Sequence, residues 1–343
     1  MNLIITGGAG FLGYHLCNKL SDKYEEILII DIAPIDPSEY PKNVRYFNAD
    51  VRNLSLLKKL FTKDSLVIHS ASALPLWKEK DILTTTIDGT KNVLIAAMEN
   101  GINRVIYISS TAVYGAPEKH PIYEDDLLVG IGPYAISKIE AERICEEYRK
   151  KGLCVPIVRP KTFIGEARLG IFQILYDWIN SGKKIPVIGD GNNRYQLLDV
   201  EDLVDAINLL LTLEENKAND TFNVGAKEFK TVKEDLSALC DFAKSKASVM
   251  KTPARLIKSL LQLFWIFKLS PIYKWVYETA DKDSFVSIEK IEKLGWLPKY
   301  SNSDALIRSY KWYLKHCDEI PKSGITHRVR WKQGILKLFK RFL

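Results

Sequence analysis

The feature that most constrains the fold of this chain is a glycine-rich turn near its start. An apolar run, Leu3–Ile5, predicts a buried strand, and the segment 11–21 after the turn predicts a helix. Glycines allow the backbone to bend tightly and to approach a pyrophosphate, and the first amides of the helix form an anion site. The spacing of Gly7, Gly10 and Gly13 therefore predicts a dinucleotide site at the end of the first strand.

A second predicted strand, Glu26–Asp31, ends in an acid. Asp31 lies 18 residues after Gly13, close to the spacing of about 20 residues expected for a carboxylate that hydrogen-bonds the adenosine ribose. Such a carboxylate repels a 2′-phosphate, so it favours NAD over NADP. The alternative interpretation is a glycine turn followed by a solvent-facing aspartate, but the order of strand, turn, helix, strand and acid favours the dinucleotide site.

Strands and helices alternate through the first half of the chain. Further strands are predicted at 44–48, 65–69 and 104–110, and helices at 81–100 and from Pro133 onward. This alternation predicts an α/β fold, a Rossmann-type doubly wound parallel sheet, in which ligands bind at the carboxyl ends of strands. Small side chains that would let a cofactor pass close to the backbone follow the fourth strand, at Ser70, Ala71 and Ser72.

The composition favours a globular protein without a large basic surface. With 343 residues, 46% of them hydrophobic, the chain can bury a full core. We expect a cytoplasmic protein, because no leader and no uncharged apolar run of about 20 residues is present. The five cysteines include no C-x-x-C pair, which argues against disulfides and against a metal site. Six basic residues and no acid follow residue 327, so the body carries only +1 of the net charge of +7, which argues against nucleic-acid binding.

A candidate catalytic set follows the fifth predicted strand. Ser110 ends that strand, and Tyr134 and Lys138 lie one turn apart on one face of the next helix. A tyrosine pKa near 10 is too high for a base at neutral pH, and a neighbouring lysine cation favours the phenolate. Ser110 could hydrogen-bond the same substrate oxygen. The alternative is an ordinary amphipathic pair with a strand cap, but the position after a dinucleotide-binding pattern favours catalysis.

These motifs together resemble the extended short-chain dehydrogenase/reductases. The resemblance is carried by 6–13, 109–115 and 133–138. The stretches 189–203, 222–225 and 294–298 resemble the substrate lobe of the nucleotide-sugar epimerase/dehydratase branch of that family.

The resemblance covers about residues 1–316 and implies a domain organisation. It implies an NAD-binding domain over 1–160, to which segments around 199–224 return, and a smaller substrate-binding lobe over 161–316. The remaining residues, 317–343, form a basic amphipathic tail. A homodimer is a family-based expectation.

The resemblance and the strand-end pattern together assign site residues. The catalytic set is Ser110, Tyr134 and Lys138. The expected contacts of NAD are Gly7, Gly10, Phe11, Leu12, Gly13, Asp31, Asp50, Val51, Ser70, Ala71, Ser72, Thr86, Ser109, Tyr134, Lys138, Pro160 and Thr162. The expected contacts of the substrate, a nucleotide sugar, are Ser110, Thr111, Tyr134, Thr162, Arg168, Arg194 and Gln196.

The two arginines are candidates for a substrate diphosphate. Guanidinium groups bind such oxygens in a bidentate manner, although either Arg168 or Arg194 could be a plain surface residue.

Departures from the family pattern narrow the expected reaction. Thr111-Ala112 stands where dehydratases carry an Asp-Glu pair, so dehydration is not expected. Thr86 and Thr162 stand where asparagine is usual, which weakens the match to simple UDP-hexose 4-epimerases. The Arg159-Pro160 pair and the Arg194-Tyr195-Gln196 stretch resemble the border with the 3β-hydroxysteroid dehydrogenase branch.

The leading hypothesis is an NAD-dependent epimerase of a nucleotide-linked sugar. It would oxidise a secondary alcohol transiently, at C4, with Tyr134 as base. The alternative is an NAD-dependent dehydrogenase of a lipid or sterol-like alcohol. A non-catalytic NAD-binding protein is the least favoured hypothesis, because all three catalytic candidates are present.

Two apolar segments could each contact either a membrane or the protein itself. The segment 254–278 combines apolar and aromatic residues with lysines, and could be a lid on the substrate lobe or a surface that enters lipid. In 328–343, apolar residues at helical spacing oppose basic ones, as in a helix at a membrane interface, and the basic residues at 328 and 330 would suit the headgroup zone. The alternative is a helix docked on the body or on a dimer partner. The interface hypothesis implies a peripheral location at the inner face of the membrane.

Overall fold

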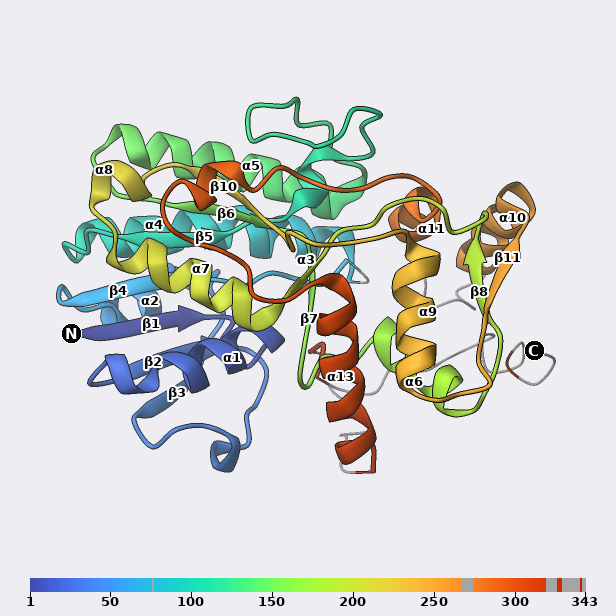
Figure 1. The fold of residues 1–343 in the computed structure, drawn as a ribbon. Coiled ribbons are helices and arrows are strands. Elements are labelled where there is room, and N and C mark those ends of the chain that lie inside the picture. Colours follow the sequence, from blue (N-terminus) through green and yellow to red (C-terminus); the bar gives the residue numbers. More distant parts are fainter. Residues whose placement is uncertain (76, 267–273, 319–325, 329–339, 341–343) are drawn as a thin grey trace.

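A seven-stranded parallel sheet forms the centre of the computed structural model, which describes residues 1–75, 77–266, 274–318, 326–328 and 340 (Figure 1). The strand order is β10-β6-β5-β4-β1-β2-β3. This order confirms the predicted Rossmann-type doubly wound sheet. The strands are β1 Asn2–Thr6, β2 Ile27–Asp31, β3 Val44–Asn48, β4 Ser65–His69, β5 Val105–Ile108, β6 Ile157–Pro160 and β10 Thr221–Val224.

Helices cover both faces of this sheet (Figure 1). On one face pack α1 (Phe11–Leu20) and α7 (Val200–Thr212), and on the other pack α2 (Leu54–Leu60), α4 (Gly89–Glu99) and α5 (Gly132–Lys150). Each face has its own cluster of buried aliphatic side chains. Because helices cover both faces of the sheet, side chains on both sides of a central strand are buried, and the strand is a continuous apolar run, as in Leu3–Ile5 of β1.

Two predicted elements differ from the structure in detail. The predicted helix 81–100 is α3 (Glu79–Leu83), a π-helical turn (Thr84–Asp88) and α4 in succession. The predicted strand 104–110 ends at Ile108, because Ser110 leaves the sheet and its Oγ accepts a hydrogen bond of 3.1 Å from the amide of Ala112. Short 3₁₀ turns occupy Ser21–Lys23, Pro37–Glu39 and Thr111–Tyr114.

A second lobe lies beside the carboxyl ends of the strands (Figure 1). Two small parallel sheets belong to it, β8 (Ile185–Ile188) with β11 (Val249–Thr252) and β7 (Thr162–Ile164) with β9 (Leu197–Asp199). A third cluster of buried side chains lies between its helices. The remaining helices are α6 Ile171–Asn180, α8 Glu215–Ala218, α9 Val232–Phe242, α10 Ala254–Ile266, α11 Lys274–Thr279, α12 Glu289–Glu292 and α13 Asn302–His316.

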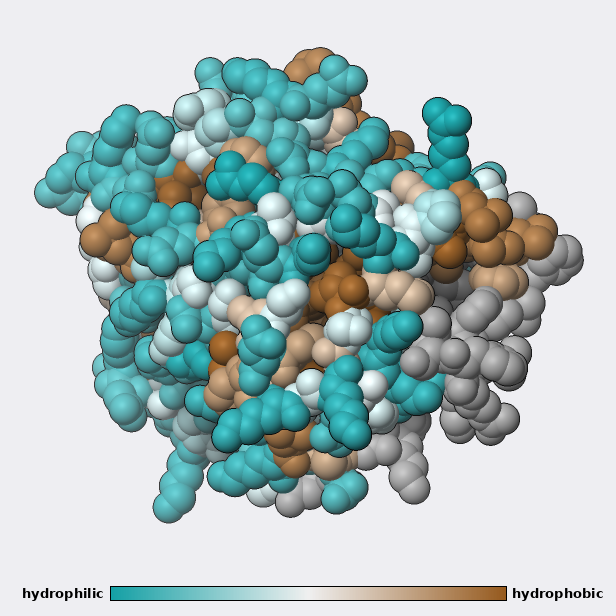
Figure 2. Space-filling model, turned by 45° about the vertical axis from the view of Figure 1, so that its right-hand side comes forward, coloured by the Kyte–Doolittle hydropathy of each residue, from teal (hydrophilic) through white to brown (hydrophobic). Residues whose placement is uncertain are grey.

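The apolar segment 254–278 forms α10 and α11, apart from residues 267–273, which lie outside the described structure. Leu261 and Tyr277 are buried, whereas Leu256 and Leu263 are exposed on α10. The surface shown in Figure 2 is mostly hydrophilic, with hydrophobic side chains in small groups, one of them near the right-hand edge. Contact of this segment with lipid stays a prediction. No described helix has the length and the apolar character to cross a bilayer.

The C-terminal tail meets the body of the protein at the residues that the structure describes. Arg328 forms an ion pair of 2.8 Å with Glu39, and its side chain is only 16% exposed. Contact of Arg328 with lipid headgroups stays a prediction, which this pairing of its charge on the protein surface does not favour. Lys340 also pairs with the body, at 2.6 Å from Asp177. The rest of the predicted tail helix lies outside the described residues.

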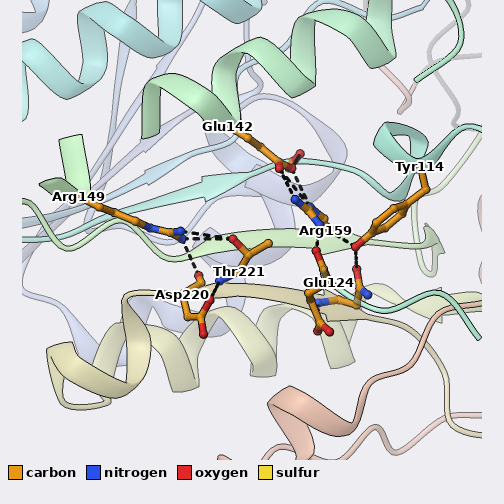
Figure 3. Close-up of polar contacts among 9 residues, drawn as sticks. Tyr114, Glu124, Glu142, Arg149, Arg159, Asp220 and Thr221 are labelled. Carbon is orange, nitrogen blue, oxygen red and sulfur yellow. Dashed lines mark hydrogen bonds and ion pairs between the residues drawn. The ribbon is translucent and has the colours of Figure 1, made fainter. Parts of the chain in front are cut away.

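A buried ion pair joins α5 to the central sheet (Figure 3). Arg159 Nη2 of β6 lies 2.6 Å from Glu142 Oε2 of α5, and the two side chains are 5% and 2% exposed. The Ser109 hydroxyl, after β5, donates to the same carboxylate. Arg159 Nη1 also donates to Tyr114 Oη at 2.7 Å, and Tyr114 donates to Asn223 of β10 at 2.8 Å. One network therefore connects α5 with three strands beneath the ends of β5 and β6.

Replacing Glu142 with glutamine tests how much this network contributes to the free energy of unfolding. The Glu142→Gln variant leaves the Arg159 guanidinium buried without its counter-charge, so we expect a loss of about 3–5 kcal/mol in the free energy of unfolding. Urea unfolding measures this loss as a lower midpoint.

The matched control is Glu140→Gln on the same helix, which breaks an exposed pair with Arg143 and should cost at most about 1 kcal/mol. Equal losses in the two variants would contradict the role assigned to Glu142.

Candidate functional site

A cavity of about 580 Å³ lies along the carboxyl ends of the central strands. The glycine-rich turn, the ends of β2, β4, β5 and β6 and the start of α5 line it. It brings together most of the predicted site residues, namely Gly7, Gly10, Phe11, Leu12, Asp31, Asp50, Val51, Ser70, Ala71, Ser72, Ser109, Ser110, Thr111, Tyr134, Lys138, Pro160, Thr162 and Arg168.

The glycine-rich turn forms a backbone cradle at one end of this cavity. Gly7 has a φ of +76°, and a Cβ there would lie 2.7 Å from the backbone nitrogen of Ala71. Gly13 lies outside the cavity lining, but a Cβ there would meet the Cα of Gly8 at 2.5 Å, so its role is to let α1 approach the turn. The first amides of α1 are left at the cavity as an anion site. The cradle fits the diphosphate of a dinucleotide.

Asp31 lies at the end of β2, at the wall of the cavity. Its carboxylate accepts hydrogen bonds from the amides of Ala9 at 3.0 Å and Ala33 at 2.9 Å. Burial raises the pKa of this carboxyl, and these backbone donors oppose the rise. The backbone therefore holds the carboxylate in the cavity wall, where it can accept hydrogen bonds from ribose hydroxyls.

The candidate catalytic residues converge on the same wall. Lys138 is buried, and its Nζ donates a hydrogen bond of 2.8 Å to the carbonyl of Ile108 at the end of β5. Burial lowers the pKa of Lys138 to about 8. Its Nζ lies 6.0 Å from the centroid of the Tyr134 ring. A cation, a phenol and the Ser110 hydroxyl therefore face one part of the cavity.

The groups that lower the pKa of Tyr134 differ from the expectation, which named Lys138; the structure gives Ser110 and Arg168. Burial raises the pKa of the phenol, and the neighbouring Ser110 hydroxyl and the charge of Arg168 oppose that rise. Arg168, considered from the sequence only as a substrate ligand, thus also acts on Tyr134. Its guanidinium lies 5.3 Å from the ring of Phe11, between the glycine-rich turn and the second lobe.

Three further predicted residues lie away from the cavity lining. Arg194 is exposed, with its guanidinium 4.8 Å and 4.6 Å from the rings of Phe229 and Phe285. Gln196 is buried and bonds the backbone at both ends, to the carbonyl of Ala226 and the amide of Val286. Thr86 is buried in the π-helical turn. Substrate contacts by Arg194 and Gln196 stay predictions that this geometry does not favour.

The structure adds residues that sequence reasoning missed. Lys161 lines the cavity and is buried. Its Nζ donates a hydrogen bond of 2.7 Å to Ser284 Oγ, and burial lowers the pKa of its ammonium group to about 7. Its position between Pro160 and Thr162 was a signal that could have identified it. Thr326 and His327 also line the cavity. No local pattern marks them, because they reach the site only through the tertiary fold. Within the described ranges, no group of three acidic, histidine or cysteine residues could hold a metal ion.

Comparisons with known proteins agree with this geometry. A family model described as "NAD dependent epimerase/dehydratase family" matches residues 3–225. The uncharacterized protein y4nG of Sinorhizobium fredii is 32% identical over 98% of this chain and 84% of its own length.

Two solved structures share the fold. The UDP-glucose 4-epimerase of Thermotoga maritima with UDP-glucose has a TM-score of 0.78 at 22% identity, over 92% of this chain and 100% of its own. The UDP-glucuronic acid 4-epimerase of Bacillus cereus with NAD has a TM-score of 0.75 at 24% identity, over 92% of this chain and 99% of its own.

These matches confirm the expected family and cofactor. The family match spans the glycine-rich turn, Asp31 and the candidate catalytic residues, and so covers the residues from which NAD was predicted. This chain therefore belongs to the NAD-dependent epimerase/dehydratase family of enzymes.

Proposed function

We propose that this protein is an NAD-dependent 4-epimerase of a nucleotide-linked sugar, with Tyr134 as the base. The observation that supports the proposal is the convergence of Ser110, Tyr134 and Lys138 on one wall of a cavity that also holds the glycine-rich cradle. The two solved structures of similar fold are 4-epimerases of UDP-sugars, which supports the same reaction and substrate class.

The protein residues would handle the proton of the reacting alcohol. The Tyr134 phenolate accepts the hydroxyl proton, and Ser110 hydrogen-bonds the same oxygen and keeps it in line with the phenolate. The Lys138 ammonium group, held by the Ile108 carbonyl 6.0 Å from the centroid of the Tyr134 ring, would add positive charge near the phenolate. Bound NAD supplies the hydride acceptor. The glycine-rich turn, Asp31 and Lys138 would hold it beside the reacting carbon.

The residues after Ser110 favour epimerisation over dehydration. Expulsion of water needs a proton donor close to the leaving hydroxyl. Thr111 and Ala112 line the cavity at the position where family dehydratases carry two acids, and neither side chain has a carboxyl group. Thr111 Oγ1 is also directed to the Pro160 carbonyl, at 3.3 Å.

Arg168 is the candidate ligand for the substrate diphosphate. It lines the cavity between the turn and the second lobe, and a guanidinium group can bind phosphate oxygens through two parallel hydrogen bonds.

The reaction is tested by product analysis on the purified protein. Incubation with UDP-hexoses and UDP-hexuronic acids, without added NAD, should give an isomer of equal mass. In a parallel reaction with added NAD, stoichiometric NADH would instead indicate a dehydrogenase, and loss of water in either reaction would indicate a dehydratase. Either result would overturn the proposal.

Removing the phenol hydroxyl tests the base. The Tyr134→Phe variant should lower kcat by about a hundredfold or more while NAD stays bound, because it removes the proton acceptor and little volume. The matched control, Tyr148→Phe, changes a tyrosine of the same helix that does not line the cavity. Near-normal turnover by Tyr134→Phe would exclude Tyr134 as the base.

Removing the charge of Arg168 tests its action on the phenol. That charge lowers the pKa of Tyr134, so the Arg168→Met variant should raise this pKa. Because the active form is the phenolate, kcat falls on the acidic side, and that limb of the pH profile should move to higher pH. Profiles of kcat at saturating substrate measure the shift, while KM reports substrate binding separately. An unchanged acidic limb would contradict this role.

Replacing Asp31 tests the choice of cofactor. The Asp31→Ala variant loses a hydrogen bond to the ribose and the repulsion of a 2′-phosphate, so the ratio of NADP to NAD dissociation constants should fall by about tenfold or more. Titrations with both cofactors measure this ratio. The control is Asp36→Ala, an exposed aspartate that caps the neighbouring turn. If the wild-type protein already binds both cofactors equally, the role of Asp31 is wrong.

A further inference from the structure

A short part of the C-terminal region forms a wall of the NAD cavity. This wall segment, residues 326–328, is far in sequence from every other lining residue, and two of its members, Thr326 and His327, line the cavity. The His327 carbonyl accepts a hydrogen bond of 3.0 Å from the amide of Leu169, in the loop of the second lobe before α6. The wall segment is therefore fixed to the second lobe at its middle residue.

The wall segment is also fixed to the dinucleotide-binding domain, through Arg328. The guanidinium lies 3.9 Å from the centroid of the Tyr14 ring, on α1. The same guanidinium group donates a hydrogen bond of 2.8 Å to the carboxylate of Glu39, in the 3₁₀ turn after β2. The Arg328 side chain is largely covered, so these contacts are less screened by solvent than an exposed pair.

A chain of contacts leads from Arg328 to the glycine-rich turn. The ring of Tyr14 meets the ring of Tyr40 edge to face, with centroids 5.7 Å apart. Tyr40 Oη donates a hydrogen bond of 3.3 Å to the carbonyl of Gly8, within the glycine-rich turn. Arg328 is thus connected through two aromatic rings to the backbone that forms the cradle.

The position of His327 indicates which part of the cofactor the wall segment covers. Arg168 contacts the ring of Phe11, the first residue of α1, and its charge acts on His327. Phe11, Arg168 and His327 all line the cavity. Phe11 begins α1, next to the anion site where the diphosphate of a bound dinucleotide must lie, and Arg168 connects it to His327.

We propose that residues 326–328 hold NAD in its cavity, with His327 covering the cofactor diphosphate and Arg328 acting as the positioning residue that fastens the wall segment to α1. Release of NAD then requires the contacts of Arg328 with Tyr14 and Glu39 to open. An epimerase uses one cofactor molecule for both hydride transfers, and a fastened wall keeps it bound between them. The inference depends on NAD binding and not on the reaction, so it stands or fails independently of epimerisation.

The test is the rate at which the full-length protein releases NAD. Protein loaded with NAD is mixed with excess fluorescent etheno-NAD, and the exchange is followed by fluorescence. We expect the Arg328→Met variant to release NAD about tenfold faster than the wild type, because it loses one largely covered ion pair and one cation–π contact. Glu39→Gln should accelerate release to a smaller extent, and it carries the test if Arg328→Met does not fold.

Rescue and control variants separate fastening from a general loss of stability. The charge-exchanged double variant Glu39→Arg with Arg328→Glu should release NAD more slowly than Arg328→Glu alone. The matched control, Arg45→Met, breaks an exposed arginine–glutamate pair with Glu26 in the same domain and should leave the release rate unchanged.

Two results would overturn the proposal. One is wild-type release rates in both Arg328→Met and Glu39→Gln. The other is NAD release by Arg45→Met that is as fast as release by Arg328→Met, which would indicate a general loss of stability.

Discussion

The buried pair of Glu142 and Arg159 is the interaction on which the geometry of the site depends. Glu142 lies one turn after Lys138 on α5, and Arg159 directly precedes Pro160 at the cavity wall. The same carboxylate accepts a hydrogen bond from the hydroxyl of Ser109, the residue before Ser110. A charge buried away from water tolerates little displacement of its partner, because the loss of a contact there costs several kcal/mol. The pair thus fixes α5 against the ends of β5 and β6, and the candidate catalytic residues lie on both sides of it.

The chemistry of the cavity follows from burial as much as from residue type. Burial raises the pKa of the Tyr134 phenol and lowers the pKa of the Lys138 ammonium group, so it disfavours the charged form of each. Ser110 and Arg168 oppose the rise at Tyr134. The pKa of the Tyr134 phenol therefore depends on the assembled wall, to which α5 contributes the phenol and the loop before α6 contributes Arg168.

The cofactor cavity of this chain is lined by more than the glycine-rich cradle. At 22% to 24% identity, the two solved epimerases retain the fold over nearly their whole length. In this chain the closing surfaces include Lys161, between two predicted cofactor contacts, and the wall segment at 326–328. Lys161 is buried against Ser284 and the ring of Tyr195. Both surfaces lie outside the glycine-rich turn, and we expect the individual properties of this enzyme to arise there.

The sequence by itself determined the parallel sheet, the cofactor turn and the identity of the candidate catalytic residues. Each of these depends on local spacing: apolar runs of strand length, glycines three residues apart, and a tyrosine and a lysine separated by one helical turn. Local spacing did not reveal that Arg194 and Gln196 lie outside the cavity, that Arg168 acts on Tyr134, or that Thr326 and His327 complete the wall. Only the tertiary structure decided these points, because they depend on which distant segments meet across the two lobes, and no periodicity within the chain encodes that meeting.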